Sequence, residues 1–75
     1  MLFDEEVDGA GERGRQMWRA AADRLHAMAP GAVLRLYSDD PAAKAVVPHL
    51  CEEAGHQLVG RIPRPEGWHF FIRKG

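Results

Sequence analysis

The sequence predicts an α/β (α+β) fold: a two-layer sandwich in which two helices cover one face of a four-stranded mixed sheet. Three observations carry this prediction. The chain has 75 residues, which is enough for one small core. Apolar residues recur with a period of about two in the strand candidates and about 3.6 in the helix candidates. Glycine and proline clusters separate these segments in the order β-α-β-α-β-β, so we expect residues 1–75 to form a single domain.

The first strand is expected within residues 2–7, where Leu2, Phe3 and Val7 surround acidic side chains. This pattern is typical of an edge strand. Acidic residues on an edge discourage pairing with another chain, which favours a monomer. A glycine-rich loop over residues 9–14 follows.

The first helix is expected from Arg15 onward and is rich in alanine, a strong helix former. Pro30 and Gly31 end it. We expect Trp18 to begin the buried stripe of this helix, whereas the burial of Met17 is left open. The full stripe consists of Trp18, Ala21, Ala22, Leu25, Met28 and Ala29.

Three further strands are predicted. Residues 33–38 are mostly apolar, which favours a central position in the sheet. Residues 56–62 form a third strand candidate. Residues 68–74 form the last strand, with Trp68, Phe70 and Ile72 on one face, and the turn at residues 63–67 joins the last two strands as a hairpin.

The second helix is expected to be capped by Asp39 or Asp40, with Pro41 in its first turn. Pro48 is expected to kink or restart this helix because proline lacks the N–H group. Gly55 ends it. The predicted buried stripe consists of Val46, Val47, Leu50, Cys51 and Ala54.

Composition restricts the functional classes. Ten Lys and Arg residues against eleven Asp and Glu residues give a net charge of −1, which argues against a nucleic-acid binder. No apolar run is long enough for a membrane span, and the acidic start does not resemble a signal peptide. A single cysteine excludes an internal disulfide. We therefore expect a cytoplasmic protein, with no nucleic-acid or membrane partner and no cofactor.

Gly9, Gly11 and Gly14 spell G-x-G-x-x-G between a strand and a helix, the pattern of a dinucleotide-binding turn. Such a site needs several βαβ units and a crevice between them, for which this chain is too short. Another explanation of the loop is therefore needed.

The segment from Pro30 to Lys74 resembles the TusA/SirA-like family of small sulfur carriers. The matching features are Pro30-Gly31 before a strand, Asp39-Asp40-Pro41, Pro48 inside the second helix, Cys51, Gly55-His56 and the terminal Phe71-Ile72-Arg73-Lys74. The resemblance implies the same two-layer sandwich. It also implies sulfur-relay partners, such as a cysteine desulfurase.

The family motif, Asp-x-x-Gly-x-x-Cys-Pro-x-Pro, carries the persulfide at the start of the first helix. Asp8 and Gly11 match it, but Gly14 stands at the cysteine position, and Arg15 and Met17 stand at the two prolines. A thiolate is favoured at a helix N-terminus by the free N–H groups and the helix dipole. With Gly14 in place of cysteine, the chain is sulfurtransferase-like by resemblance only, and whether it is an enzyme is left open.

Cys51 is the alternative sulfur carrier, although its place on an apolar stripe favours a core role. Many family members hold a cysteine there beside the motif cysteine. His49, Cys51 and His56 lack metal-ligand spacing on a helix, so no metal is expected.

The surface around the start of the first helix is the expected binding site. Its candidate residues are Asp8, Gly11, Arg13, Gly14, Arg15 and Met17. Free N–H groups and two arginines there could hold a small anion, and the plainer alternative is a solvated loop. Two functional classes result: a non-catalytic or regulatory relative that binds a partner protein or an anion there, and an active sulfur carrier that uses Cys51 or acts with a desulfurase.

Overall fold

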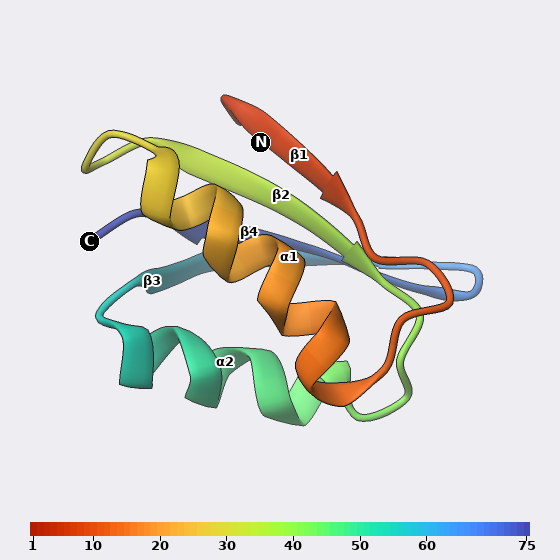
Figure 1. Cartoon of the computed structure of the whole chain (residues 1–75). Helices are drawn as coiled ribbons and strands as arrows, with labels where there is room; N and C mark the ends of the chain where they lie inside the picture. Colours follow the sequence, from red (N-terminus) through yellow and green to blue (C-terminus); the bar gives the residue numbers. More distant parts are fainter.

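The computed structural model describes all residues from Met1 to Gly75. Its elements follow the predicted order: β1 (Glu5–Asp8), α1 (Gly14–Ala27), β2 (Val33–Ser38), α2 (Ala43–Ala54), β3 (Gln57–Arg64) and β4 (Gly67–Arg73). The strands form one sheet in the order β1-β2-β4-β3. Figure 1 shows both helices on the same side of this sheet. The predicted two-layer α+β sandwich is confirmed.

The sheet is mixed. β1 and β2 are parallel, whereas β4 runs antiparallel to both of its neighbours, β2 and β3. The expected central position of residues 33–38, the edge position of β1 and the final hairpin are therefore confirmed. The parallel pair is joined through α1, as a crossover requires.

The core lies between the sheet and the helices. Leu34 and Leu36 alternate with Arg35 and Tyr37 along β2, so the leucines face the helices. The same face of β4 contributes Phe70 and Ile72. The buried cluster contains Val7, Met17, Ala21, Leu25, Met28, Leu34, Leu36, Ala43, Val47, Cys51, Phe70 and Ile72.

The core stripe of α1 differs from the expected one by a small rotation. Met17 is fully buried and begins the stripe, whereas Trp18 is half-buried and packs against the edge of the core. Adjacent positions on a helix point about 100° apart, so a small shift in the buried face exchanges their roles. Met17 therefore offers no exposed surface to a ligand.

The first strand begins at Glu5 instead of within residues 2–4. The Val33 N–H donates to the Asp4 carboxylate at 2.8 Å, and the Asp4 N–H donates to the Val33 carbonyl at the same distance. A side chain thus replaces a backbone partner at this end of the ladder. Residues 1–3 precede the strand and cross the face of the sheet opposite the helices.

Helix ends and prolines account for three further differences. α1 ends at Ala27, and the Lys74 ammonium donates to the Leu25 carbonyl at 2.7 Å, satisfying a free acceptor of the last turn. α2 continues through Pro48, so the predicted restart is wrong; the carbonyl that loses its partner belongs to Lys44, which is exposed to water. β3 runs on through Pro63, which an edge strand tolerates.

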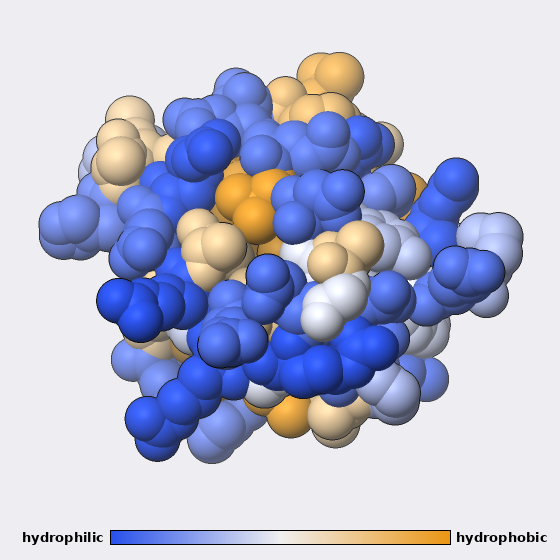
Figure 2. All heavy atoms as spheres, turned by 45° about the vertical axis from the view of Figure 1, so that its right-hand side comes forward, coloured by the Kyte–Doolittle hydropathy of each residue, from blue (hydrophilic) through white to orange (hydrophobic).

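Neither α1 nor α2 has the length and apolar character of a bilayer-spanning helix. Figure 2 shows that, on the face it presents, apolar side chains reach the surface in small patches between hydrophilic ones.

Candidate functional site

Two consecutive carboxylates hold the loop between β1 and α1. The Gly11 N–H donates to Asp39 Oδ1 at 3.0 Å, and Arg13 Nη1 donates to the same oxygen at 2.8 Å. The Gly14 N–H donates to Asp40 Oδ2 at 2.9 Å. Asp39 and Asp40 follow β2, so the carboxyl ends of the parallel strands β1 and β2 meet at this loop.

The prediction that Asp39 or Asp40 caps the second helix is wrong. The N-cap of α2 is Ala42, which makes no side-chain cap, and α2 begins at Ala43. Asp40 Oδ1 does accept the Ala42 N–H at 2.9 Å in the turn before the helix. Its other oxygen serves α1 instead, a long-range partner that local pattern reading misses.

These bonds shift the acidity of both carboxyl groups. The Gly11 N–H and the Arg13 guanidinium lower the pKa of Asp39 below its usual value. The Gly14 and Ala42 N–H groups do the same for the pKa of Asp40. Both groups are therefore carboxylates at neutral pH. The N–H groups of Gly11 and Gly14 were expected to be free to bind an anion. They already donate hydrogen bonds to these carboxylates.

Glycines permit the path of the loop. Gly11 has a φ of +80° and Gly14 a φ of +54°, both in the region that favours glycine. Gly9 is buried, and a Cβ there would lie 2.7 Å from the Tyr37 carbonyl oxygen. Asp8 ends β1 and accepts the Ala10 N–H at 3.0 Å, which makes it part of the turn.

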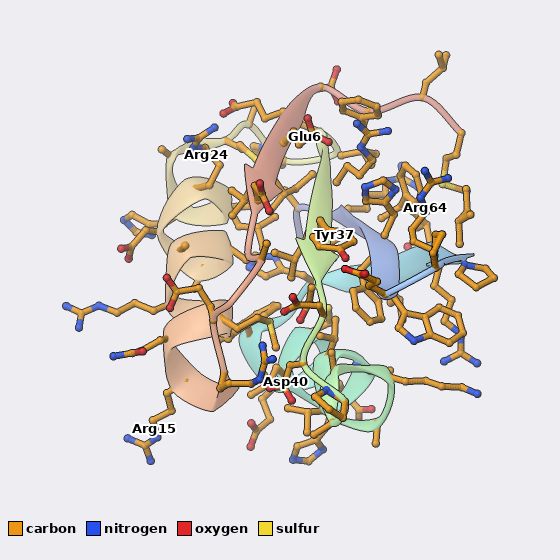
Figure 3. The ribbon with its side chains drawn as sticks, turned by 90° about the vertical axis from the view of Figure 1, so that its right-hand side faces the viewer. Glu6, Arg15, Arg24, Tyr37, Asp40 and Arg64 are labelled. Carbon is orange, nitrogen blue, oxygen red and sulfur yellow. The ribbon has the colours of Figure 1, made fainter.

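A groove of about 690 Å³ runs between α1 and α2 and begins at Gly14. Its apolar lining comes from both helices, and each lining side chain is half-buried. Arg15 and Arg19 line it as well, and neither takes part in the four ion pairs of the chain. Figure 3 shows Arg15 pointing outward from the first turn of α1 and Asp40 near the start of that helix. The apolar lining consists of Trp18, Ala22, Val46 and Leu50.

Cys51 lies on the core side of α2 and is 1% exposed. Burial raises the pKa of its thiol to about 11. A neutral, enclosed thiol is a poor nucleophile. Cys51 and Gly14 are thus different kinds of position, one buried with a thiol and one exposed without one.

The remaining histidine candidates do not converge on Cys51. His49 Nε2 lies 3.6 Å from a Glu53 carboxylate oxygen on the exposed face of α2. His56 Nδ1 accepts the Gly75 N–H at 3.0 Å, and burial together with the Lys74 charge lowers its pKa. His56 therefore fastens the end of the chain to the start of β3.

Comparison with known proteins adds the family. The model of the family described as "Sulfurtransferase TusA" matches residues 19–74, most of the chain. This chain belongs to the TusA family. A curated TusA relative, "Sulfur carrier protein TusA" of Pseudomonas entomophila (strain L48), is 24% identical over 74 residues, which cover 99% of this chain and 92% of that protein.

The TusA family model begins to match at Arg19, after the loop and the first turn of α1. Gly14, which we expect to correspond to the motif cysteine, lies before the residues that the family model matches. The structure places Gly11, Arg13, Gly14 and Arg15 together at the exposed start of α1, with Asp8 in the adjoining turn, and it separates Met17 from them. The groove residues Arg19, Val46 and Leu50 were not anticipated as site residues. Half-burial of apolar side chains on two facing helices reveals Val46 and Leu50, whereas Arg19 is exposed and charged.

Proposed function

We propose that this chain is a TusA-family protein that binds a protein of the sulfur relay without carrying sulfur itself. The binding surface is the interhelical groove, which consists of Trp18, Ala22, Val46 and Leu50 with Arg15 and Arg19, together with the start of α1. The observation that carries the proposal is the exposed, thiol-free Gly14 at the mouth of this groove. In this proposal the groove is the docking surface, and the chain's one thiol, that of Cys51, is buried away from it.

The lining of the groove supports protein docking. Trp18 is half-buried, and aromatic side chains that retain exposed area are frequent energetic centres of interfaces. Arg15 and Arg19 bring two positive charges that have no acidic partner within the chain. Such charges favour a partner segment that presents an apolar side chain beside carboxylates.

A binding role without transfer makes the protein a regulator. If it occupies the surface on which a desulfurase receives a cysteine-bearing carrier, it slows the delivery of sulfur to that carrier. Its effect then depends on its concentration relative to the active carrier, as competition requires.

Transfer through Cys51 is less well supported. The thiol is enclosed in the core, and its raised pKa keeps it protonated at neutral pH. An anion at the start of α1 is also less well supported. Asp39 and Asp40 already accept the Gly11 and Gly14 N–H groups, and their charges would repel a second anion.

The test measures sulfur transfer from L-cysteine, through the host's purified cysteine desulfurase, to a cysteine-bearing TusA carrier. Mass spectrometry follows the gain of one sulfur atom by each protein. We expect the present chain to slow loading of the carrier in a dose-dependent way and to gain no sulfur itself. Trp18→Ala should inhibit far less than the unmodified chain. Ile62→Ser, on the opposite face of the sheet, is the matched control and should inhibit fully.

Two outcomes would contradict the proposal. Sulfur on the present chain, mapped to Cys51, would support the active-carrier alternative. Undiminished loading of the carrier in the presence of a large excess of the chain would exclude competition for the desulfurase.

A further inference from the structure

The face of the sheet opposite the helices is divided into a covered half and an open half. Residues 1–3 cover one half: the ring of Phe3 lies 6.3 Å from that of Phe71, and the Met1 side chain lies against Gly60. The Arg35 guanidinium lies 4.1 Å from the centre of the Phe3 ring and pairs with Glu6. As a result, Phe71 is only 2% exposed although no helix covers it.

The open half presents a row of side chains across three strands. Tyr37 of β2 is paired in register with His69 of β4, and His69 with Ile62 of β3. The Tyr37 and His69 rings meet edge to face, with their centres 5.4 Å apart. Arg64 lies two residues after Ile62 and therefore on the same face.

Tyr37, His69 and Arg64 border a hollow of about 390 Å³ at the β3–β4 turn. The hollow is shallow and open to solvent, so a bound ligand would keep part of its surface exposed. Figure 3 shows Tyr37 and Arg64 on the side of the sheet turned away from the helices. The lining consists of Tyr37, Arg64, Pro65, Glu66 and His69.

The hollow contains one guanidinium that is free to bind a ligand. Arg13, Arg24 and Arg35 each pair with a carboxylate, but Arg64 is absent from the ion pairs of the chain. Its planar set of donors matches carboxylate and phosphate oxygens. The Tyr37 hydroxyl and the His69 ring nitrogens add neutral donors and acceptors.

The surroundings of His69 lower the pKa of its imidazole, which favours the neutral form at pH 7. Burial and the charges of Arg35 and Arg64 lower its pKa, and Glu6 and Asp8 oppose this shift. An oxyanion bound beside Arg64 would offset the positive charges and raise the pKa of His69. The charged and titratable groups that face the imidazole are Tyr37 and Arg35 of β2, Glu6 and Asp8 of β1, Arg64 of β3 and Glu66 of the turn.

We propose that this hollow binds a small planar ring that carries an oxyanion. The ring lies against Tyr37, His69 and Pro65, and the oxyanion accepts hydrogen bonds from Arg64 and from Tyr37 or His69. Glu66 lies at the rim and limits the negative charge that the site tolerates. This site is on the opposite face from the interhelical groove and does not depend on the proposed docking function.

Phenyl phosphate is the probe, and the imidazole and amide resonances of the full chain are followed by NMR during its titration. We expect saturable shifts at Tyr37, Arg64 and His69 and a raised pKa of His69. Ring contact should make phenyl phosphate bind about three- to tenfold more tightly than inorganic phosphate. Arg64→Gln should abolish the shifts, and Glu66→Gln should strengthen binding. Arg61→Gln is the matched control, because Arg61 points to the other face and lies over Trp68.

Uridine monophosphate and O-phosphotyrosine distinguish two common sources of such a group, a nucleotide and a modified protein side chain. The one that shifts the same resonances at lower concentration identifies the source. The proposal is overturned if phenyl phosphate leaves His69 unshifted at millimolar concentration, or if Arg61→Gln weakens binding as much as Arg64→Gln. Equal affinity for phenyl phosphate and inorganic phosphate would overturn the ring contact.

Discussion

The Asp40 carboxylate accepts the backbone N–H of Gly14 at 2.9 Å, which connects the turn before α2 to the first residue of α1. The same carboxylate accepts the Ala42 N–H. One side chain thus connects the start of α1 to the turn that precedes α2, and the start of α1 forms one end of the interhelical groove.

Replacing this carboxylate should destabilise the protein. Asp40→Ala removes both acceptors and should lower the free energy of unfolding by about 1–2 kcal/mol, because two backbone N–H groups lose a charged hydrogen-bond acceptor. Urea denaturation provides the measurement. Asp23→Ala, on the exposed side of α1, is the control and should change stability little. An unchanged midpoint for Asp40→Ala would show that water replaces the carboxylate at no cost.

The same contacts predict acid sensitivity. The pKa values of Asp39 and Asp40 are lowered in the folded state, so unfolding takes up protons once the pH falls below the ordinary Asp value of about 3.9. The stability that these groups contribute is complete above that pH and disappears as the pH falls through the lowered values. Unfolding free energies measured from pH 6 downward should fall more steeply for the unmodified chain than for Asp40→Asn. Parallel profiles would contradict the assignment.

Cys51 should be unreactive in the folded protein. A pKa of about 11 leaves roughly one thiol in a thousand ionised at pH 8, and the side chain is enclosed as well. Labelling with an aromatic disulfide reagent should be very slow in buffer and rapid in denaturant. Rapid labelling of the folded chain would contradict this prediction and support Cys51 as a sulfur carrier.

Restoring cysteine at Gly14 should produce an exposed, reactive thiol at a cost in stability. Gly14 has a φ of +54°, so a side chain there should cost roughly 1–2 kcal/mol, although a Cβ would meet no neighbour within 4 Å. Gly14→Ala, which has the same strain without the thiol, should match that cost. Gly14→Cys should react with thiol reagents far faster than Cys51. Full stability in both variants would contradict the need for glycine.

Met17 and Trp18 should have separate roles despite being adjacent. Met17→Ala empties a fully buried position and should cost about 2–5 kcal/mol. Trp18→Ala should cost less because the ring is half-exposed, but it should reduce inhibition of sulfur transfer. Urea denaturation and the transfer assay measure the two effects. Equal losses of stability would mean that Trp18 serves the core rather than a partner.

Much of the fold could be predicted from local pattern. The mostly apolar residues of β2 indicated its central position, and the alternation of Trp68, Phe70 and Ile72 indicated the buried face of β4. These signals are local because each depends on which face of an element meets the core. The TusA resemblance was equally readable, since its features are distributed along the second half of the chain.

The site was less predictable because its contacts join distant segments. Asp39 and Asp40 precede a helix and were assigned to it, yet Asp39 accepts from Gly11 and Arg13. Asp40 accepts from Gly14 as well as from Ala42. Likewise, whether Met17 or Trp18 meets the core depends on where α2 packs against α1. No periodicity within a single helix contains that information.

The position of β4 affects how the chain folds during synthesis. This strand is the last in sequence but lies between β2 and β3, and it supplies Phe70 and Ile72 to the core. A nascent chain that has emerged only as far as β3 has no partner for that strand and leaves Leu34 and Leu36 uncovered on one side. Folding must therefore wait for residues 67–73 to leave the ribosome, and until then the exposed apolar strands are a target for chaperones and proteases.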